Sequence, residues 1–163
     1  MKPKANPIIH IIDKSPAYCK IIESCLLGLG YSNFHSYYKS ADWLEHATQP
    51  DIIILDYDLG EKQVSGLELL HAYYKLYTNT HFVFMSSNTN LDIALSAIKL
   101  GACDYILKSK QGLEQLVKKI DTLVRKKAEQ KRKKICYRSL LAILGMICIV
   151  FITAIIFYAK HSD

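Results

Sequence analysis

The chain has 163 residues, of which 50% are hydrophobic and 22% charged, and its formal net charge is +6. This length allows one ordinary domain with a short addition, and the apolar fraction is ample for a buried core. The charge is local: residues 118–138 carry ten Lys or Arg against two acids, a surplus of eight that leaves about −2 elsewhere. The five cysteines form no C-x-x-C pair, which argues against a zinc centre and favours free thiols in a reducing compartment.

The first half of the chain alternates apolar runs with helical patterns. Ser15 and Pro16 are typical of a helix start, as the N-cap and the first helical position, and Gly28 and Gly30 indicate where that helix ends. The run Ile52–Leu55 has no polar residue and predicts a strand that is buried on both faces. The elements expected up to this point are strands at 7–12, 33–38 and 51–56 and helices at 16–28 and 40–47.

The second half continues the alternation. Gly101 indicates the end of one amphipathic helix, and the apolar stripe of the last helix stops at Val124, although helix-forming residues continue to about Lys134. The elements expected here are helices at 66–77 and 90–100, strands at 80–85 and 103–107, and a helix from Gly112 onward. Five strand–helix repeats predict an α/β fold with a doubly wound parallel sheet. The absence of G-x-G-x-x-G after the first strand argues against a dinucleotide site.

Residues 139–159 contain no charged side chain and no His, Asn, Gln or Pro. A helix of this length spans about 31 Å, so the sequence predicts a transmembrane helix rather than the alternatives, a core helix or a dimer-forming helix. The basic stretch 126–138 before it indicates the cytoplasmic side, because Lys and Arg concentrate there. We therefore expect a single-pass protein of the cytoplasmic membrane with its domain in the cytoplasm. The basic stretch is then expected to contact membrane lipid rather than nucleic acid.

Polar residues follow four of the predicted strands at the point where each ends. These residues are Asp13, Asp56 with Asp58, Ser86 and Lys108. The carboxyl ends of parallel strands meet at one edge of an open sheet, which is where such sheets bind their ligands. In the flavodoxin-like strand order 2-1-3-4-5, the strands carrying these side chains lie side by side, so we expect the side chains to converge.

This ordered set of residues resembles the receiver domain of two-component response regulators, over roughly residues 7–125. The resemblance implies that Asp56 accepts a phosphoryl group from a histidine kinase or a phosphotransfer protein, and that Lys108 and Ser86 contact that group. Tyr105 matches the aromatic position whose ring moves inward on activation. A protein partner is expected to bind the face built by the fourth helix, fifth strand and fifth helix, about 90–125. We expect a receiver domain at 1–125, a basic linker at 126–138, the span at 139–159 and a tail at 160–163.

Three departures from the family pattern bear on this interpretation. Receivers carry a second acid after the first strand as an Mg²⁺ ligand, and here Lys14 stands at that position. Mg²⁺ would then depend on Asp13, Asp56 and Asp58, unless the Lys14 ammonium replaces the metal. Ser109 stands where the family has proline, and the loop after Asp56 is about two residues longer than usual.

The departures leave alternatives open. One is a pseudo-receiver, an adaptor that binds partners without phosphate. Another is a phosphatase of the haloacid-dehalogenase type, because Asp56 and Asp58 after a strand resemble its nucleophile and general acid. The preferred hypothesis is a signalling domain that accepts phosphate and is not an enzyme in its own right.

Overall fold

The computed structural model describes residues 6–46, 48–60 and 64–160, apart from the side chains of 46, 150, 151 and 153–160. Two compact units divide the chain, Met1–Val124 and Arg125–Asp163. The elements in chain order are β1 (Ile9–Ile12), α1 (Pro16–Gly28), β2 (Phe34–Tyr37), α2 (Ser40–His46), β3 (Ile52–Leu55), α3 (Gly66–Tyr73), β4 (His81–Ser86), α4 (Leu91–Lys99), β5 (Asp104–Leu107) and α5 (Lys110–Lys160).

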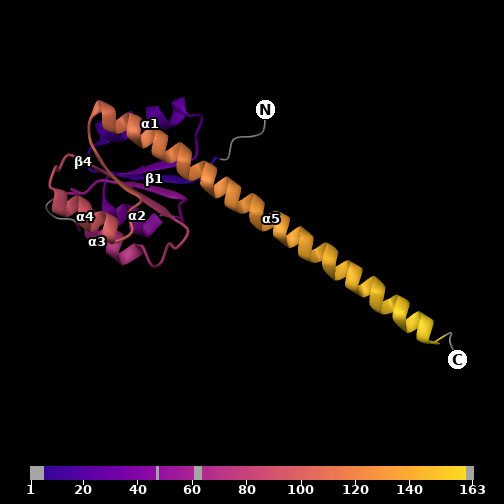
Figure 1. Cartoon of the computed structure of the whole chain (residues 1–163). Helices are drawn as coiled ribbons and strands as arrows, with labels where there is room; N and C mark the ends of the chain where they lie inside the picture. Colours follow the sequence, from indigo (N-terminus) through magenta and orange to yellow (C-terminus); the bar gives the residue numbers. More distant parts are fainter. Residues whose placement is uncertain (1–5, 47, 61–63, 161–163) are drawn as a thin grey trace. The chain divides into compact units, whose positions relative to one another are not determined.

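The five strands form one parallel sheet in the order β2-β1-β3-β4-β5, which confirms the predicted flavodoxin-like topology. Every residue of β1 and β3 is buried, as expected for inner strands covered on both faces, whereas the edge strands β2 and β5 are partly exposed. Figure 1 shows α1 and the first turns of α5 on one face of the sheet and α2, α3 and α4 on the other.

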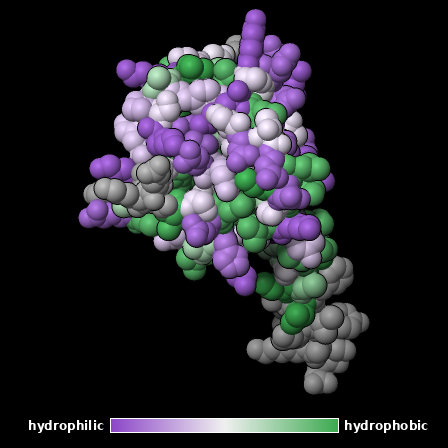
Figure 2. Space-filling view, turned by 90° about the vertical axis from the view of Figure 1, so that its left-hand side faces the viewer, coloured by the Kyte–Doolittle hydropathy of each residue, from purple (hydrophilic) through white to green (hydrophobic). Residues whose placement is uncertain are grey.

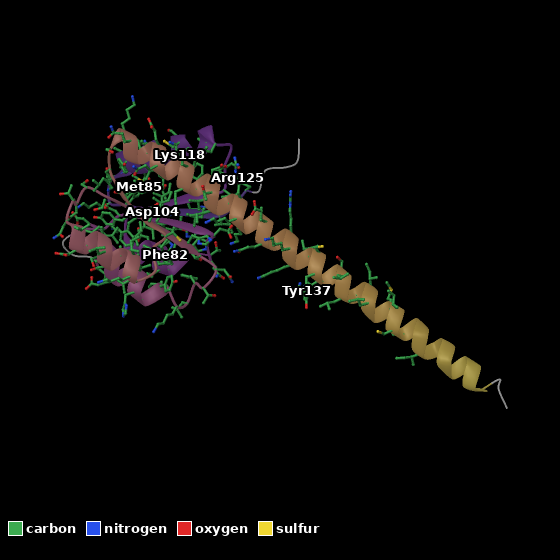
Figure 3. The ribbon with its side chains drawn as sticks, in the orientation of Figure 1. Phe82, Met85, Asp104, Lys118, Arg125 and Tyr137 are labelled. Atoms are coloured by element: carbon green, nitrogen blue, oxygen red, sulfur yellow. The ribbon has the colours of Figure 1, made fainter. Side chains whose placement is uncertain are left out.

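The sheet separates two hydrophobic cores. Alternate residues of each strand point to opposite faces, so Met85 of β4 joins the core beneath α1 and α5, whereas Phe82 joins the core beneath α2, α3 and α4. Figure 3 shows these two side chains on opposite faces of the sheet. The second core includes Trp43, whose ring packs edge-on against Tyr73 at a centroid distance of 5.2 Å. Both cores together hold the strand ends in a fixed register.

Capping side chains define where the helices begin. The Ser15 side chain accepts a hydrogen bond from the backbone N–H of Tyr18 at the start of α1, as the sequence predicts. At α3, Ser65 and Glu68 form a capping box, in which each side chain accepts from the backbone N–H of the other residue. The backbone N–H of Gly66 also donates to the carbonyl oxygen of Tyr57, 2.9 Å away. Both ends of the loop after β3 are thereby fixed.

The predicted helix over 66–77 is too long, because α3 ends at Tyr73. The chain then turns: the backbone N–H groups of Leu76 and Tyr77 both donate to the carbonyl of Tyr73. This turn stacks the Tyr77 ring on Tyr73, with both rings packed against Trp43. Aromatic packing on the second core therefore takes the place of another helical turn.

The last helix begins at Lys110, two residues before the expected start at Gly112. The Ser109 side chain accepts a hydrogen bond from the Gly112 N–H at 2.9 Å and so acts as the cap. A Cβ at Gly112 would lie 1.8 Å from the carbonyl oxygen of Leu107, which only glycine avoids. Ser109 and Gly112 together thus join β5 closely to α5.

The C-terminal half of α5 corrects two expectations. The stretch 126–138 is helical throughout, so the helix continues past the end expected at about Lys134. No helix in the described residues is both long and apolar enough to cross a bilayer, so the transmembrane helix predicted at 139–159 and the location in the cytoplasmic membrane are wrong. The residues of α5 directly before that segment are basic, up to Arg138, whereas a span requires roughly 20 consecutive apolar residues. Nothing in the described residues shows the lipid partner expected for the basic stretch. Of the tail expected at 160–163, residues 161–163 lie outside the described residues.

Candidate functional site

The strand register brings the predicted site residues to one edge of the sheet. Ile12 of β1 pairs with Leu55 of β3, so the residues that follow them, Asp13 and Asp56, lie side by side. The backbone N–H of Asp56 donates to the carbonyl of Ile12 at 2.9 Å, which extends the ladder to Asp56 itself. α5 starts at the left in Figure 1 directly after β5, so the strands end on that side. Figure 2 looks onto this side, where hydrophilic side chains gather over much of the surface.

An open pocket of about 650 Å³ lies at this edge. It is lined by Asp13, Lys14, Ser15, Tyr18, Asp56, Tyr57, Asp58, Ser86, Ser87, Asn88 and Lys108. The structure therefore brings together every predicted site residue except Tyr105, which is not among the residues that line the pocket.

Lys108 joins the two buried carboxylates. Its Nζ lies 2.7 Å from Oδ2 of Asp13 and 2.7 Å from Oδ2 of Asp56. The side chains of Lys108, Asp13 and Asp56 are only 12%, 3% and 5% exposed, so water screens these ion pairs weakly. A single ammonium group thus neutralises part of the charge of both acids at the point where β1, β3 and β5 end.

Burial and charge set the protonation of this group. Burial is the largest influence on Asp56 and raises the pKa of its carboxyl; the nearby charge of Asp13 adds to the rise, whereas the hydrogen bond from Lys108 opposes it. Burial alone would lower the pKa of Lys108, but its contacts with Asp13 and Asp56 outweigh that effect and raise the pKa. Lys108 is therefore a permanent cation at neutral pH, fixed between its two partners.

Asp58 points to Lys14 rather than into the group around Lys108. Nζ of Lys14 lies 2.5 Å from Oδ2 of Asp58, and the Gly60 N–H donates to Oδ1 of Asp58 at 3.0 Å. The hydrogen bond from Lys14 lowers the pKa of the Asp58 carboxyl. The two side chains are 45% and 63% exposed, so this ion pair lies at the mouth of the pocket. Both oxygens of Asp58 already have a partner.

Ser86 and Tyr105 are connected through the loop that follows β4. Ser86 is buried, and its hydroxyl oxygen accepts a hydrogen bond from the Asn88 N–H at 3.1 Å. The Tyr105 hydroxyl donates to the Asn88 carbonyl at 2.8 Å, and its ring stacks on Phe84 with a centroid distance of 6.1 Å. Tyr105 therefore holds the segment that carries Ser86, from outside the pocket.

Two neighbours of the site were missed at the sequence level. In the sequence, Tyr18 has the spacing of an apolar helix position, yet its ring lies 4.9 Å from Nζ of Lys108 and lines the pocket. Its place three residues after the N-cap Ser15, on the first turn facing the strand ends, is the signal that could have identified it. Gly66 lies against the backbone of Asp56: a Cβ there would be 2.3 Å from the carbonyl oxygen of Asp56.

The side chains present do not fit the Mg²⁺ site that the family resemblance implies. Receiver domains generally bind Mg²⁺ for phosphorylation, through carboxylate oxygens and water. Here Lys108 contacts Asp13 and Asp56, and Lys14 contacts Asp58, so a cation of the protein itself already holds each of the three acids. Within the described part of the chain, no three acidic, His or Cys side chains form a group that could hold a metal ion.

Comparison with known proteins gives relatives that are regulatory proteins. The chain is 32% identical over 101 residues to the nitrogen assimilation regulatory protein NtrX of Azorhizobium caulinodans, an alignment covering 61% of this chain and 22% of that protein. It is 32% identical over 59 residues to the luminescence regulatory protein LuxO of Vibrio campbellii, covering 36% of this chain and 13% of that protein. The chain thus spans less than a quarter of the length of these relatives.

Solved structures share the fold at low identity. The signal receiver domain of a putative LuxO repressor protein from Vibrio parahaemolyticus superimposes with a TM-score of 0.66 at 19% identity, covering 77% of this chain and 96% of that one. A CheY-like receiver domain protein from Methanospirillum hungatei gives a TM-score of 0.64 at 21% identity, covering 74% and 96%. The model of the response regulator receiver domain family matches residues 9–121, which include all five strands and Asp13, Asp56, Ser86 and Lys108. This chain belongs to the response regulator receiver domain family.

Proposed function

We propose that this chain is a response regulator that accepts a phosphoryl group on Asp56 from a histidine kinase or a phosphotransfer protein, with residues 1–125 as its receiver domain. One observation carries the proposal: the Asp56 carboxylate lies at the end of a buried strand with Nζ of Lys108 at 2.7 Å. The pair supplies a nucleophile and a cation for the charge that develops on the phosphoryl oxygens.

Each residue has a separate task in the transfer. An Asp56 oxygen attacks phosphorus, the bond from phosphorus to the donor's nitrogen or oxygen breaks, and the donor leaves with that electron pair. Lys108, already beside Asp56, pairs with a phosphoryl oxygen as a compact charge. The Ser86 hydroxyl turns from the Asn88 N–H to the phosphoryl group. Loss of that contact reaches Tyr105 through the carbonyl of the same Asn88 and allows its ring to move.

A relative of the same fold supports the acceptor chemistry. A response regulator from Burkholderia pseudomallei was solved with a phosphorylated aspartic acid, and it superimposes on 75% of this chain with a TM-score of 0.60 at 21% identity. Asp56 is the aspartate of this chain that lies at the end of β3 in a pocket, where such chemistry requires it.

The surface for a protein partner is the face of α4, β5 and the first turns of α5. Apolar side chains reach solvent there: Leu91 is 69% exposed, and Leu95, Ile98 and Leu107 are each more than 40% exposed. Tyr105 lies on β5 within this face, so movement of its ring changes the surface that a partner meets. Phosphorylation at Asp56 is thereby coupled to docking.

The proposal is tested by incubating the purified chain with acetyl phosphate, and with candidate histidine kinases, and separating the products on a phosphate-affinity gel. Wild type is expected to give a shifted band that Asp56→Asn lacks. Asp42→Asn, an exposed acid on α2, is the matched control and should shift like wild type. Absence of an Asp56-dependent band with every donor contradicts the proposal.

A second candidate is a phosphate-independent adaptor, favoured by the cation at position 14 and its ion pair with Asp58. In that case wild type and Asp56→Asn bind the same partner with equal affinity, and no donor labels either one. The phosphatase alternative gains no such support. Its general acid must hold a proton, whereas the ion pair with Lys14 lowers the pKa of Asp58.

A further inference from the structure

The acceptor pocket contains a cation at the place where the family has a metal ligand. Lys14 directly follows Asp13, lines the pocket, and its Nζ lies 2.5 Å from Oδ2 of Asp58. Asp58 is itself held toward Lys14, because the Gly60 N–H donates to its other oxygen. The ion pair therefore bridges the loops that follow β1 and β3, across the mouth of the pocket.

The remaining oxygens leave little room for a divalent ion. Oδ1 of Asp13 accepts the Ser15 N–H at 2.9 Å, and Oδ2 of Asp13 and of Asp56 each lie 2.7 Å from Nζ of Lys108. Mg²⁺ requires near-octahedral oxygen ligands and gives up its water reluctantly. To bind here it would have to displace two ammonium groups from three carboxylates and would also meet their repulsion.

The charge balance leads to the same conclusion. Three carboxylates and two ammonium groups leave the pocket with one net negative charge, so the family's metal is not needed to hold the acids together. A lysine brings three donors on a flexible stem. The Lys14 side chain is 45% exposed, which leaves it free to turn from Asp58 toward a dianionic group entering the pocket.

We propose that Lys14 is the resident cation of this pocket, taking the place of the divalent metal, so that an anion binds and a phosphoryl group is accepted at Asp56 without Mg²⁺. The phosphoryl part of this inference rests on the proposed function. Lys14 contacts a phosphoryl oxygen at the mouth of the pocket while Lys108 contacts another at its base, and Asp58 releases Lys14 as the phosphoryl group arrives.

The first arm of the test measures metal binding without any phosphodonor. Mg²⁺ is titrated into the full chain, and backbone amide shifts are followed at residues 13, 56 and 58. Wild type and the control Lys20→Ala, an exposed lysine of α1, are expected to show no saturable shift, whereas Lys14→Asp gains one. A saturable wild-type shift at these amides overturns the inference.

The second arm measures the initial rate of labelling by acetyl phosphate, in EDTA and in excess Mg²⁺. Wild type is expected to react equally in both. Lys14→Ala is expected to react roughly tenfold more slowly in both, which is the cost of one charge-assisted hydrogen bond. Lys14→Asp is expected to require Mg²⁺, and Lys14→Arg to keep the wild-type independence of metal.

The two arms separate the inference from the function on which it rests. Wild type that is labelled on Asp56 only when Mg²⁺ is present overturns the role of Lys14 and leaves the phosphoacceptor function standing. Wild type that is never labelled contradicts the phosphoacceptor function. In that case the first arm still decides the inference, because it asks only whether Lys14 keeps the metal out.

Discussion

Lys108 and Asp56 lie 52 positions apart in the sequence, yet their charged atoms are 2.7 Å from each other beneath a surface that exposes 12% of one side chain and 5% of the other. The contact joins the end of β5 to the end of β3 across β4. Because Asp13 shares the same ammonium group, removing Lys108 leaves two neighbouring carboxylates with no cation between them.

Lys108→Met is therefore expected to lower the free energy of unfolding at pH 7 by about 3 kcal/mol, since breaking a buried ion pair leaves an uncompensated charge. The double variant Lys108→Met with Asp56→Asn should regain much of this stability, because it removes the charge of one of the two facing carboxylates. Urea unfolding followed by Trp43 fluorescence measures the free energy of unfolding of wild type, the two single variants and the double variant, which form a double-mutant cycle. If the double variant is no more stable than Lys108→Met alone, repulsion between Asp13 and Asp56 is not the cause.

Much of the fold could be predicted from the sequence because the central strand β3 has no polar residue. Ile52–Leu55 is apolar at every position, so its burial on both faces, and with it a parallel sheet, follows from composition. Polar residues directly after such runs mark the edge at which the strands end. The order β2-β1-β3-β4-β5 then brings Asp13, Asp56 and Lys108 together without any further information.

The remaining features depend on contacts that no local pattern encodes. Asp58 could join Asp56 or turn to Lys14, and the sequence does not decide between these two arrangements. The outcome depends on the exposed side chains of Lys14 and Asp58 at the pocket mouth. α3 stops at Tyr73 because Tyr77 packs on Trp43, which lies more than 30 positions away in the chain. Tyr18 has helical apolar spacing, which conceals its contact with Lys108.

Gly66→Ala should disturb the acceptor directly. The added Cβ would lie 2.3 Å from the Asp56 carbonyl oxygen and 3.0 Å from the Phe84 ring, so we expect a loss of about 1–3 kcal/mol in unfolding free energy and slower labelling of Asp56. Gly28→Ala is the matched control at the end of α1, where nothing lies within 4 Å of the new Cβ, and it should stabilise by up to about 1 kcal/mol. Equal behaviour of the two variants would contradict the packing argument.

His10 is expected to make the protein sensitive to acid. Its Nδ1 accepts the Trp43 indole N–H at 2.9 Å, and burial, helped by the charge of His35, lowers its pKa from 6.5 to about 4. Between these pH values the unfolded chain binds a proton that the folded protein does not, so stability falls as pH decreases from 6.5 to 4. A shift of this size corresponds to about 3 kcal/mol.

His10→Gln keeps an acceptor for the indole and removes the titration, so its loss of stability between pH 6.5 and pH 4 should be smaller than that of wild type. Urea unfolding across this range measures the two slopes. His35→Gln, an exposed histidine of β2, should keep most of the wild-type slope. Asp56 acts in the opposite direction: burial raises the pKa of its carboxyl, so its contribution to stability is lost as pH rises. Only the difference in slope between wild type and His10→Gln is therefore diagnostic.

The ring of Tyr18 should matter more to Lys108 than its hydroxyl. Nζ of Lys108 lies 4.9 Å from the ring centroid, a cation–π contact that contributes about 0.5–1 kcal/mol. Tyr18→Phe is expected to keep the wild-type labelling rate of Asp56, whereas Tyr18→Leu lowers it several-fold. If Phe and Leu slow labelling equally, the hydroxyl rather than the ring is responsible.

Tyr105→Phe removes the hydrogen bond to the Asn88 carbonyl and keeps the stacking on Phe84. We expect a modest loss of about 1 kcal/mol in stability, together with faster hydrogen exchange at the amides of residues 87–90. The Tyr137→Phe control changes an exposed tyrosine of α5 and should alter neither quantity. Unchanged exchange in Tyr105→Phe would mean that the hydroxyl does not hold this loop.

The double anchoring of the chain after β3 has a practical consequence. Gly66 is bonded to Tyr57, and Ser65 and Glu68 cap each other, so the backbone on both sides is fixed independently of what connects Gly60 to Val64. A peptide epitope or a fluorescent tag spliced into that connection should leave the acceptor carboxylate undisturbed.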